Sequence, residues 1–130
     1  MAAKKKTEEE QNTRRLGLVA TKVGRVPIMA DNFDDAEGNP AGGFAQGVGF
    51  EIVWQNGVTR DADGRLMLQT GAFVEDVVMA VIQRMEFYQR GKFASDYNAA
   101  ALEHLNKALV AMESRRRDRE NRGVDGRHEL

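Results

Sequence analysis

Aromatic rings, an amide and cations gather between residues 87 and 98, and these residue types suit nucleotide binding. The group consists of Phe87, Tyr88, Arg90, Lys92, Phe93, Tyr97 and Asn98. Aromatic faces stack on nucleobases, and an amide hydrogen-bonds to a base edge or a ribose hydroxyl. Arginine binds phosphate through two parallel hydrogen bonds, and residues 115–122 are rich in arginine. The two groups together predict a small nucleotide pocket, with Tyr88 and Arg119 among its candidate residues.

A purely structural role is the alternative for the same side chains. Phe87 and Phe93 would then close the apolar end of a helical hairpin, and the arginines would solvate a helix terminus. The residues alone leave both roles open. Trp54 favours a core position, because a tryptophan on an apolar strand face is usually buried.

Residues suited to catalysis are scarce. The chain has no cysteine, and its two histidines are His104, expected on the solvent side of a helix, and His128, in a polar tail. No serine lies in a Gly-x-Ser-x-Gly turn, and no spacing of His, Asp and Glu is typical of a metal site. We therefore predict a binding protein that is not an enzyme and needs neither metal nor cofactor.

Composition and charge favour an ordinary intracellular protein. The 130 residues carry a formal net charge of −1, so no global field selects nucleic acid or an acidic membrane. No apolar run approaches the roughly 20 residues that a membrane span requires, and no apolar signal region follows Lys4. We expect a cytoplasmic protein that contacts neither membrane nor nucleic acid.

Residues 72–122 have the pattern of a helical hairpin, which must position the aromatic and arginine groups. The first arm carries a wide apolar stripe of Val74, Val77, Val78, Val81, Ile82 and Met85. The second arm carries a narrower seam of Leu102, Leu105, Leu109 and Met112. Gly91 is expected to end the first helix in the left-handed conformation, and Ser95 or Asp96 to cap the second. Gly123 is expected to end the second helix.

Residues 16–70 are predicted to form a β-rich part. Val48–Trp54 is the clearest strand, because its apolar residues alternate with others. Asn56-Gly57 predicts a hairpin turn directly after it. The return strand begins at Val58 or spans Arg65–Gln69, and both alternatives remain open.

The predicted fold is α+β, with a small N-terminal antiparallel sheet followed by an antiparallel two-helix hairpin. Before the clear strand, Leu16–Met29 predicts one or two short strands and Asp31–Gly43 predicts a loop. One domain is expected over residues 16–126. A disordered polar tail over residues 1–15 and a short tail over residues 127–130 flank it.

Both helical arms carry apolar residues away from their main stripes. These residues are Phe73, Met79, Phe87, Ala99, Ala101 and Val110. A monomer of this size would expose some of them, and exposed apolar patches usually mark association. We expect a homo-oligomer in which hairpins pack against copies of themselves.

An ordered set of segments resembles the phage Thoeris anti-defence sponge proteins. The segments are Trp54-Gln55-Asn56-Gly57, Gly71–Val77, Arg84–Gln89, Lys92-Phe93, Asn98-Ala99 and the closing stretch from Arg116 to Gly126. The hairpin is also similar to that of the phage anti-CBASS nucleotide sponges. The resemblance covers Trp54 to Gly126.

The resemblance implies binding without catalysis. Members of the family sequester a cyclic ADP-ribose isomer, glycocyclic ADP-ribose, which bacterial TIR-domain defence enzymes make. They form homodimers or homohexamers with ligand between subunits, and some hold cyclic di- or trinucleotides in a separate site. By position, Phe87 and Asn98 would contact the ADP-ribose ligand, and Arg115 and Arg60 would meet phosphates in one or other site.

The sequence departs from the family pattern in three places. Asp96-Tyr97 stands where the family often has Arg-Glu, which removes a cation near the pocket and bears on ligand identity. Val58 stands in place of a proline, and Arg127-His128 in place of Thr-His. The alternative function is a nucleic-acid-binding or structural phage protein that uses the arginine-rich helix end on phosphates.

Overall fold

The computed structural model describes residues 28–130, which fall into two compact units. One unit holds residues 28–57 together with residues 69–71, and the other holds residues 58–68 together with residues 72–130. The tail predicted over residues 1–15 and nearly all of the strands predicted over Leu16–Met29 lie outside the described residues. One domain over residues 16–126 stays a prediction.

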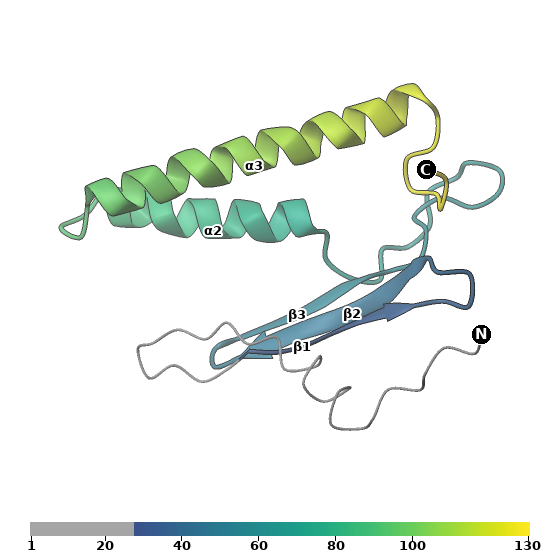
Figure 1. Ribbon diagram of the computed structural model, residues 1–130, viewed down its shortest axis with the longest axis horizontal. Helices are drawn as coiled ribbons and strands as arrows, with labels where there is room; N and C mark the ends of the chain where they lie inside the picture. Colours follow the sequence, from purple (N-terminus) through teal and green to yellow (C-terminus); the bar gives the residue numbers. More distant parts are fainter. Residues whose placement is uncertain (1–27) are drawn as a thin grey trace, which may run out of the picture. The chain divides into compact units, whose positions relative to one another are not determined.

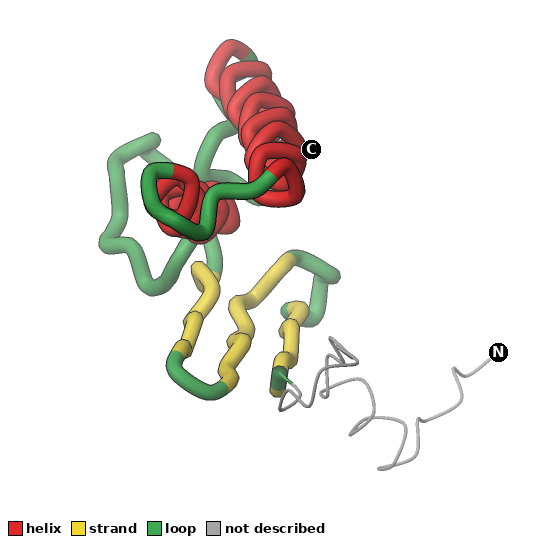
Figure 2. The backbone as a smooth tube through the Cα atoms, turned by 90° about the vertical axis from the view of Figure 1, so that its left-hand side faces the viewer, coloured by secondary structure: helices red, strands yellow, loops and turns green. Residues whose placement is uncertain are grey.

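The first unit is a three-stranded antiparallel sheet of β1 (Met29–Asp34), β2 (Pro40–Gly47) and β3 (Phe50–Asn56). The strands lie in the order β1-β2-β3, and they appear as neighbouring arrows in Figure 1 and as neighbouring yellow segments of the tube in Figure 2. Each strand pairs antiparallel with the next along the chain, so the two connections are short turns, one between β1 and β2 and one between β2 and β3. With the helices that follow, this sheet confirms the predicted α+β class.

The loop predicted over Asp31–Gly43 is wrong, because most of that range belongs to β1 and β2. Glycine is what makes the pairing possible: a Cβ on Gly43 would collide with the backbone carbonyl of Asp31. Only the connection remains a turn, in which the Asp35 carboxylate accepts the backbone N–H groups of Glu37 and Asn39, both at 2.9 Å.

The hairpin predicted at Asn56-Gly57 is also wrong. β3 pairs with β2, with Gly47 opposite Phe50, so the tight turn is at Val48-Gly49. Neither predicted return strand pairs with β3 within the described sheet. The Gln55 Oε1 instead accepts the N–H groups of Thr70 and Gly71 at 3.0 and 3.2 Å. A side-chain amide thus joins residues 69–71 to the end of β3.

The second unit contains the helical hairpin of α2 (Val74–Gln89) and α3 (Asp96–Asn121), as predicted. The two helices lie side by side in Figure 1. Ile82, from the predicted stripe, is 7% exposed and is the buried apolar side chain among residues 28–130. The core of this unit therefore lies along the seam between the helices and is small.

The caps of the two helices follow the sequence in part. The Ser95 hydroxyl accepts the Asn98 N–H at 3.1 Å and caps α3, and Gly123 (φ +72°) ends that helix. The left-handed conformation predicted for Gly91 is wrong, since Gly91 is not among the positive-φ glycines. Arg90 instead ends α2 in the right-handed helical region (φ −84°, ψ −8°). Its N–H points at the carbonyls of Glu86 and Phe87, so the turn is closed without a left-handed residue.

Candidate nucleotide-binding site

The elbow, residues 84–98, joins the helices and is held by side-chain amides. The Gln89 Nε2 donates to the Ser95 carbonyl at 3.1 Å, while its Oε1 accepts the Ser95 N–H at 2.9 Å. Across the same turn, the Asn98 Nδ2 donates to the Phe93 carbonyl at 3.1 Å. These hydrogen bonds give partners to the Ser95 N–H and the Phe93 carbonyl at the ends of the helices, and a second donor to the Ser95 carbonyl, which also accepts the Ala99 N–H at 3.1 Å.

Phe87 presents an open ring at the elbow, since 54% of the residue is exposed. Tyr88 is half-buried beside it, with ring centroids 6.1 Å apart and planes tilted by 57°. The Arg84 guanidinium carbon lies 5.1 Å from the Phe87 centroid and 5.0 Å from the Tyr88 centroid. A guanidinium at this distance over a ring is attracted to the π-face. The elbow therefore offers an aromatic surface with an arginine held against it.

Arg84 was not predicted as a site residue. Its sequence signal is spacing: it lies three and four positions before Phe87 and Tyr88 on one helix, which places the three side chains on the same face.

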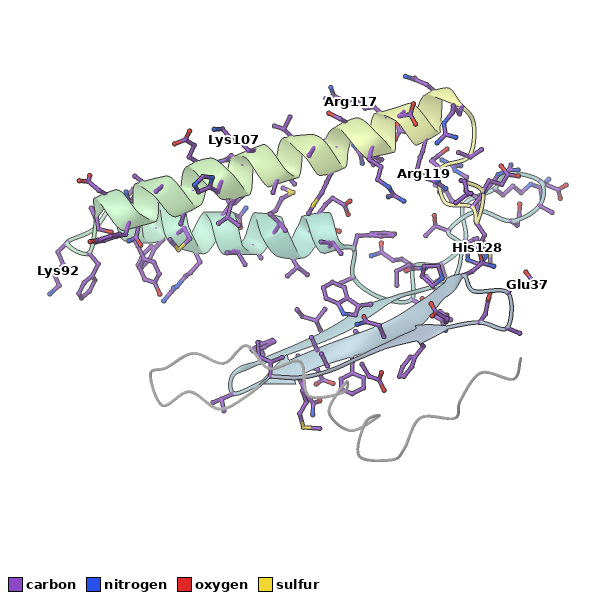
Figure 3. All side chains as sticks on the ribbon, in the orientation of Figure 1. Glu37, Lys92, Lys107, Arg117, Arg119 and His128 are labelled. Carbon is purple, nitrogen blue, oxygen red and sulfur yellow. The ribbon has the colours of Figure 1, made fainter. Side chains whose placement is uncertain are left out.

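Phe93 and Tyr97 extend into solvent, with exposed fractions of 71% and 87%. Lys92, at the tip of the elbow in Figure 3, places its Nζ 5.8 Å from the Phe93 centroid. In this chain Phe87 and Phe93 do not fill an apolar interior. The alternative in which these two rings close the end of the hairpin is therefore disfavoured.

The opposite end of α3 forms a second arginine-rich region, the C-terminal junction of residues 58–66 and 119–130. Arg119 donates to three backbone carbonyls, those of Val124, Arg127 and Glu129, at 2.9, 2.9 and 2.6 Å. The Arg60 Nε pairs with the Asp125 carboxylate at 3.2 Å, and its Nη1 donates to the Gly64 carbonyl at 3.0 Å. The predicted ligand residues Arg60 and Arg119 thus both hold the chain together here.

The junction also depends on a close approach of the backbone at Gly126. The Gly126 carbonyl accepts the N–H groups of Thr59 and Arg60 at 2.9 and 3.3 Å. A Cβ at this position (φ +70°) would collide with the Thr59 hydroxyl. The nearby Arg127 Nε is buried and has no hydrogen-bond partner among the described atoms.

The remaining arginines of α3 differ in their partners. Arg116 pairs with Glu113 at 2.8 Å and with Glu120 at 3.8 Å, and Arg122 pairs with Asp118 at 3.1 Å. Arg115 and Arg117 are exposed, and no ion pair with a described residue is present for either. Arg115 is therefore the predicted site arginine that keeps its donors for another molecule.

The predicted site residues do not meet within one chain. Phe87, Tyr88 and Asn98 belong to the elbow, and Arg60 and Arg119 to the junction. Since Asn98 and Arg119 are 21 positions apart on the continuous helix α3, they lie about 30 Å apart along its axis. Figure 3 shows Lys92 and Arg119 toward the two ends of that helix. Within one chain, therefore, the aromatics and the junction arginines do not form a single pocket, and the nucleotide pocket stays a prediction.

No three His, Asp or Glu side chains within residues 28–130 are grouped as a metal site requires. Neither helix in that range is both long and apolar enough to cross a bilayer.

Comparison with known proteins gives one informative similarity. No protein-family model matches the chain. Over 59 residues the chain is 39% identical to Thoeris anti-defense 1 of Bacillus phage SBSphiJ7, which is 45% of this chain and 42% of that protein. The aligned region thus spans less than half the length of that relative. The similarity confirms the resemblance of this chain to a phage Thoeris anti-defence protein.

Proposed function

We propose that this protein is a phage anti-defence protein that sequesters glycocyclic ADP-ribose made by TIR-domain enzymes of the Thoeris system. It binds the signal in the cytoplasm of the infected bacterium and does not cleave it. The similarity to Thoeris anti-defense 1 supports the anti-Thoeris role. The observation that carries the binding role is that the elbow holds both an exposed ring, Phe87, and an oriented amide, Asn98.

The elbow matches the chemistry of such a ligand. A cyclic ADP-ribose isomer offers a purine face, ribose hydroxyls and a diphosphate. The purine stacks on Phe87, with Tyr88 at the edge of the stack. Because one Asn98 N–H is directed to the Phe93 carbonyl, the amide is oriented and its Oδ1 remains to accept from a hydroxyl or the adenine amino group.

The assembly we propose is a homodimer or homohexamer. Apolar side chains on the hairpin are exposed: Phe73, Val74, Met79, Val81 and Val110 range from 36% to 66%. Exposed apolar surface of this kind favours packing between copies. In such an assembly Arg115 of a second copy contacts ligand phosphates at an elbow, or forms a separate site for cyclic di- or trinucleotides. Arg60 would join it only through donors other than the Nε and Nη1 that already bond Asp125 and Gly64.

Calorimetry with purified full-length protein tests the proposal. Glycocyclic ADP-ribose is titrated into the protein, the complex is heated to denature it, and the released nucleotide is identified by mass spectrometry. Saturable binding and recovery of intact ligand are expected. Recovery of a cleaved product would favour a hydrolase, and absence of binding would reject the sponge. Native mass spectrometry of the same mixture reports stoichiometry and assembly.

The nucleic-acid alternative is less well supported, because most arginines at the end of α3 have internal partners. Arg116, Arg119 and Arg122 are directed at carboxylates or carbonyls of their own chain. A duplex-binding surface requires free cations, and its affinity falls steeply as salt is raised. A steep salt dependence of duplex binding at moderate ionic strength would restore this alternative.

A further inference from the structure

We propose that Arg84 is a ligand-binding residue that takes the diphosphate of the nucleotide at the elbow. The inference rests on the proposed function and deepens it, because it names the cation that serves the Phe87 site from the same chain. A nucleotide whose base stacks on Phe87 holds its phosphates one ribose away from that base. The junction arginines of the same chain are too far away to reach them.

The position of Arg84 is fixed by two rings. Its guanidinium carbon lies 5.1 Å from the Phe87 centroid and 5.0 Å from the Tyr88 centroid, and its Nε lies 3.3 Å from the Tyr88 hydroxyl, to which it donates. A planar guanidinium stacked this way loses little further freedom when it binds an anion. Its remaining N–H groups are the donors for phosphate oxygens.

No acidic side chain within residues 28–130 forms an ion pair with Arg84. The positions three and four residues away on α2 are Ala80, Val81, Phe87 and Tyr88, and none is acidic. Arg116 on α3 is the contrast, since Glu113 and Glu120 occupy the corresponding positions and both pair with it. An exposed guanidinium with open donors beside a stacking ring is suited to a purine nucleotide with phosphates.

The ring arrangement also leaves space for the base. The guanidinium occupies one side of Phe87, and over half of the residue stays exposed. The nucleobase stacks on the open part of the ring, while the diphosphate turns toward Arg84. Phe87 thus binds the base, and Arg84, one turn earlier on α2, binds the diphosphate.

The test is titration of glycocyclic ADP-ribose into wild-type protein and into the Arg84→Met, Arg84→Lys and Arg117→Met variants, at low and high ionic strength. Methionine keeps much of the side-chain volume and removes the charge, so we expect affinity to fall roughly tenfold or more. Lysine keeps the charge without the planar fork, so an intermediate loss is expected. Arg117→Met removes an exposed arginine far from the elbow and should bind as wild type does.

Salt dependence separates charge recognition from a structural effect. If Arg84 contacts phosphate, Arg84→Met loses part of the salt dependence seen for wild type. A loss of affinity with unchanged salt dependence, or wild-type affinity in Arg84→Met, overturns the inference while the sponge stands. If Arg84→Met loses helical circular dichroism, the affinity of Arg84→Lys is used in its place. Wild-type affinity in Arg84→Lys then overturns the inference. If the wild-type protein does not bind glycocyclic ADP-ribose, the proposed function is rejected together with the role of Arg84.

Discussion

The two ends of the helical hairpin use the same kind of residue for different purposes. At the elbow, Arg84 lies against aromatic rings and keeps donors open to solvent. At the C-terminal junction, Arg119 directs its donors at three carbonyls of its own backbone. The difference teaches that the number of arginines in a segment says little about anion binding. The partners that the chain already supplies decide which arginines are available.

The largest expected effect tests the structural role of the junction. Gly126→Ala places a Cβ against Thr59 in a left-handed conformation, so we expect a loss of about 3 kcal/mol in the free energy of unfolding. Chemical denaturation measures it. Gly123→Ala is the matched control, because Gly123 has a similar φ of +72° and nothing within 4 Å of the added Cβ. Equal losses in the two variants would show that the close approach at Gly126 is unimportant.

A somewhat smaller effect is expected from the arginine that closes the junction. Arg119→Met leaves three carbonyls without their charged donor, which should cost roughly 2 kcal/mol of stability. Arg115→Met should leave the melting temperature unchanged and weaken ligand binding, because Arg115 has no described ion pair. Thermal melts of both variants measure stability, and calorimetry measures ligand affinity. If Arg115→Met lowered stability and Arg119→Met weakened only ligand binding, the two arginines would have the opposite roles, and the comparison between the two ends of the hairpin would fail.

The elbow prediction concerns affinity instead of stability. Phe87→Ala and Asn98→Ala should each weaken binding of glycocyclic ADP-ribose by about 1–3 kcal/mol, through lost stacking and lost hydrogen bonding. Arg117→Met is the control, because Arg117 is exposed and lies 19 positions from Asn98 along α3. Calorimetry on folded variants decides. Wild-type affinity in both Phe87→Ala and Asn98→Ala would move the site away from the elbow.

The smallest effect sharpens the role of the cap. Ser95→Ala removes the hydroxyl that accepts the Asn98 N–H, and about 1 kcal/mol of stability should be lost. Ser114→Ala is the comparison within α3, since its hydroxyl donates back to the Val110 carbonyl and caps nothing. A denaturation series in which Ser114→Ala is the more damaging variant would contradict the cap.

The hairpin was predictable because its periodicity is strong and the caps of α3 are ordinary. Val78, Ile82 and the leucine seam of α3 alternate at helical spacing, and Ser95 and Gly123 sit where caps belong. Most of the sheet was not predictable from the sequence. β1 and β2 are rich in Asp, Asn and Gly, which by composition indicate a loop, and their pairing depends on glycines that admit a neighbouring backbone.

The sequence indicates the residue types of the candidate site but not their grouping. Phe87 and Asn98 both belong to the elbow, as their short separation in sequence indicates. The separation of Arg60 and Arg119 from them follows from the length of α3, which a list of candidate residues does not convey. Whether an arginine is already bound internally depends on tertiary contacts such as that between Arg60 and Asp125, 65 positions apart.

The amide of Gln89 has a consequence for kinetics. By bonding both the N–H and the carbonyl of Ser95, it locks the connection between the helices as a neighbouring strand would. A receptor surface that is already rigid needs no rearrangement on encounter, so association should be limited by collision and orientation. If the protein sequesters a nucleotide signal as proposed, fast association would help it to bind that signal before the effector does.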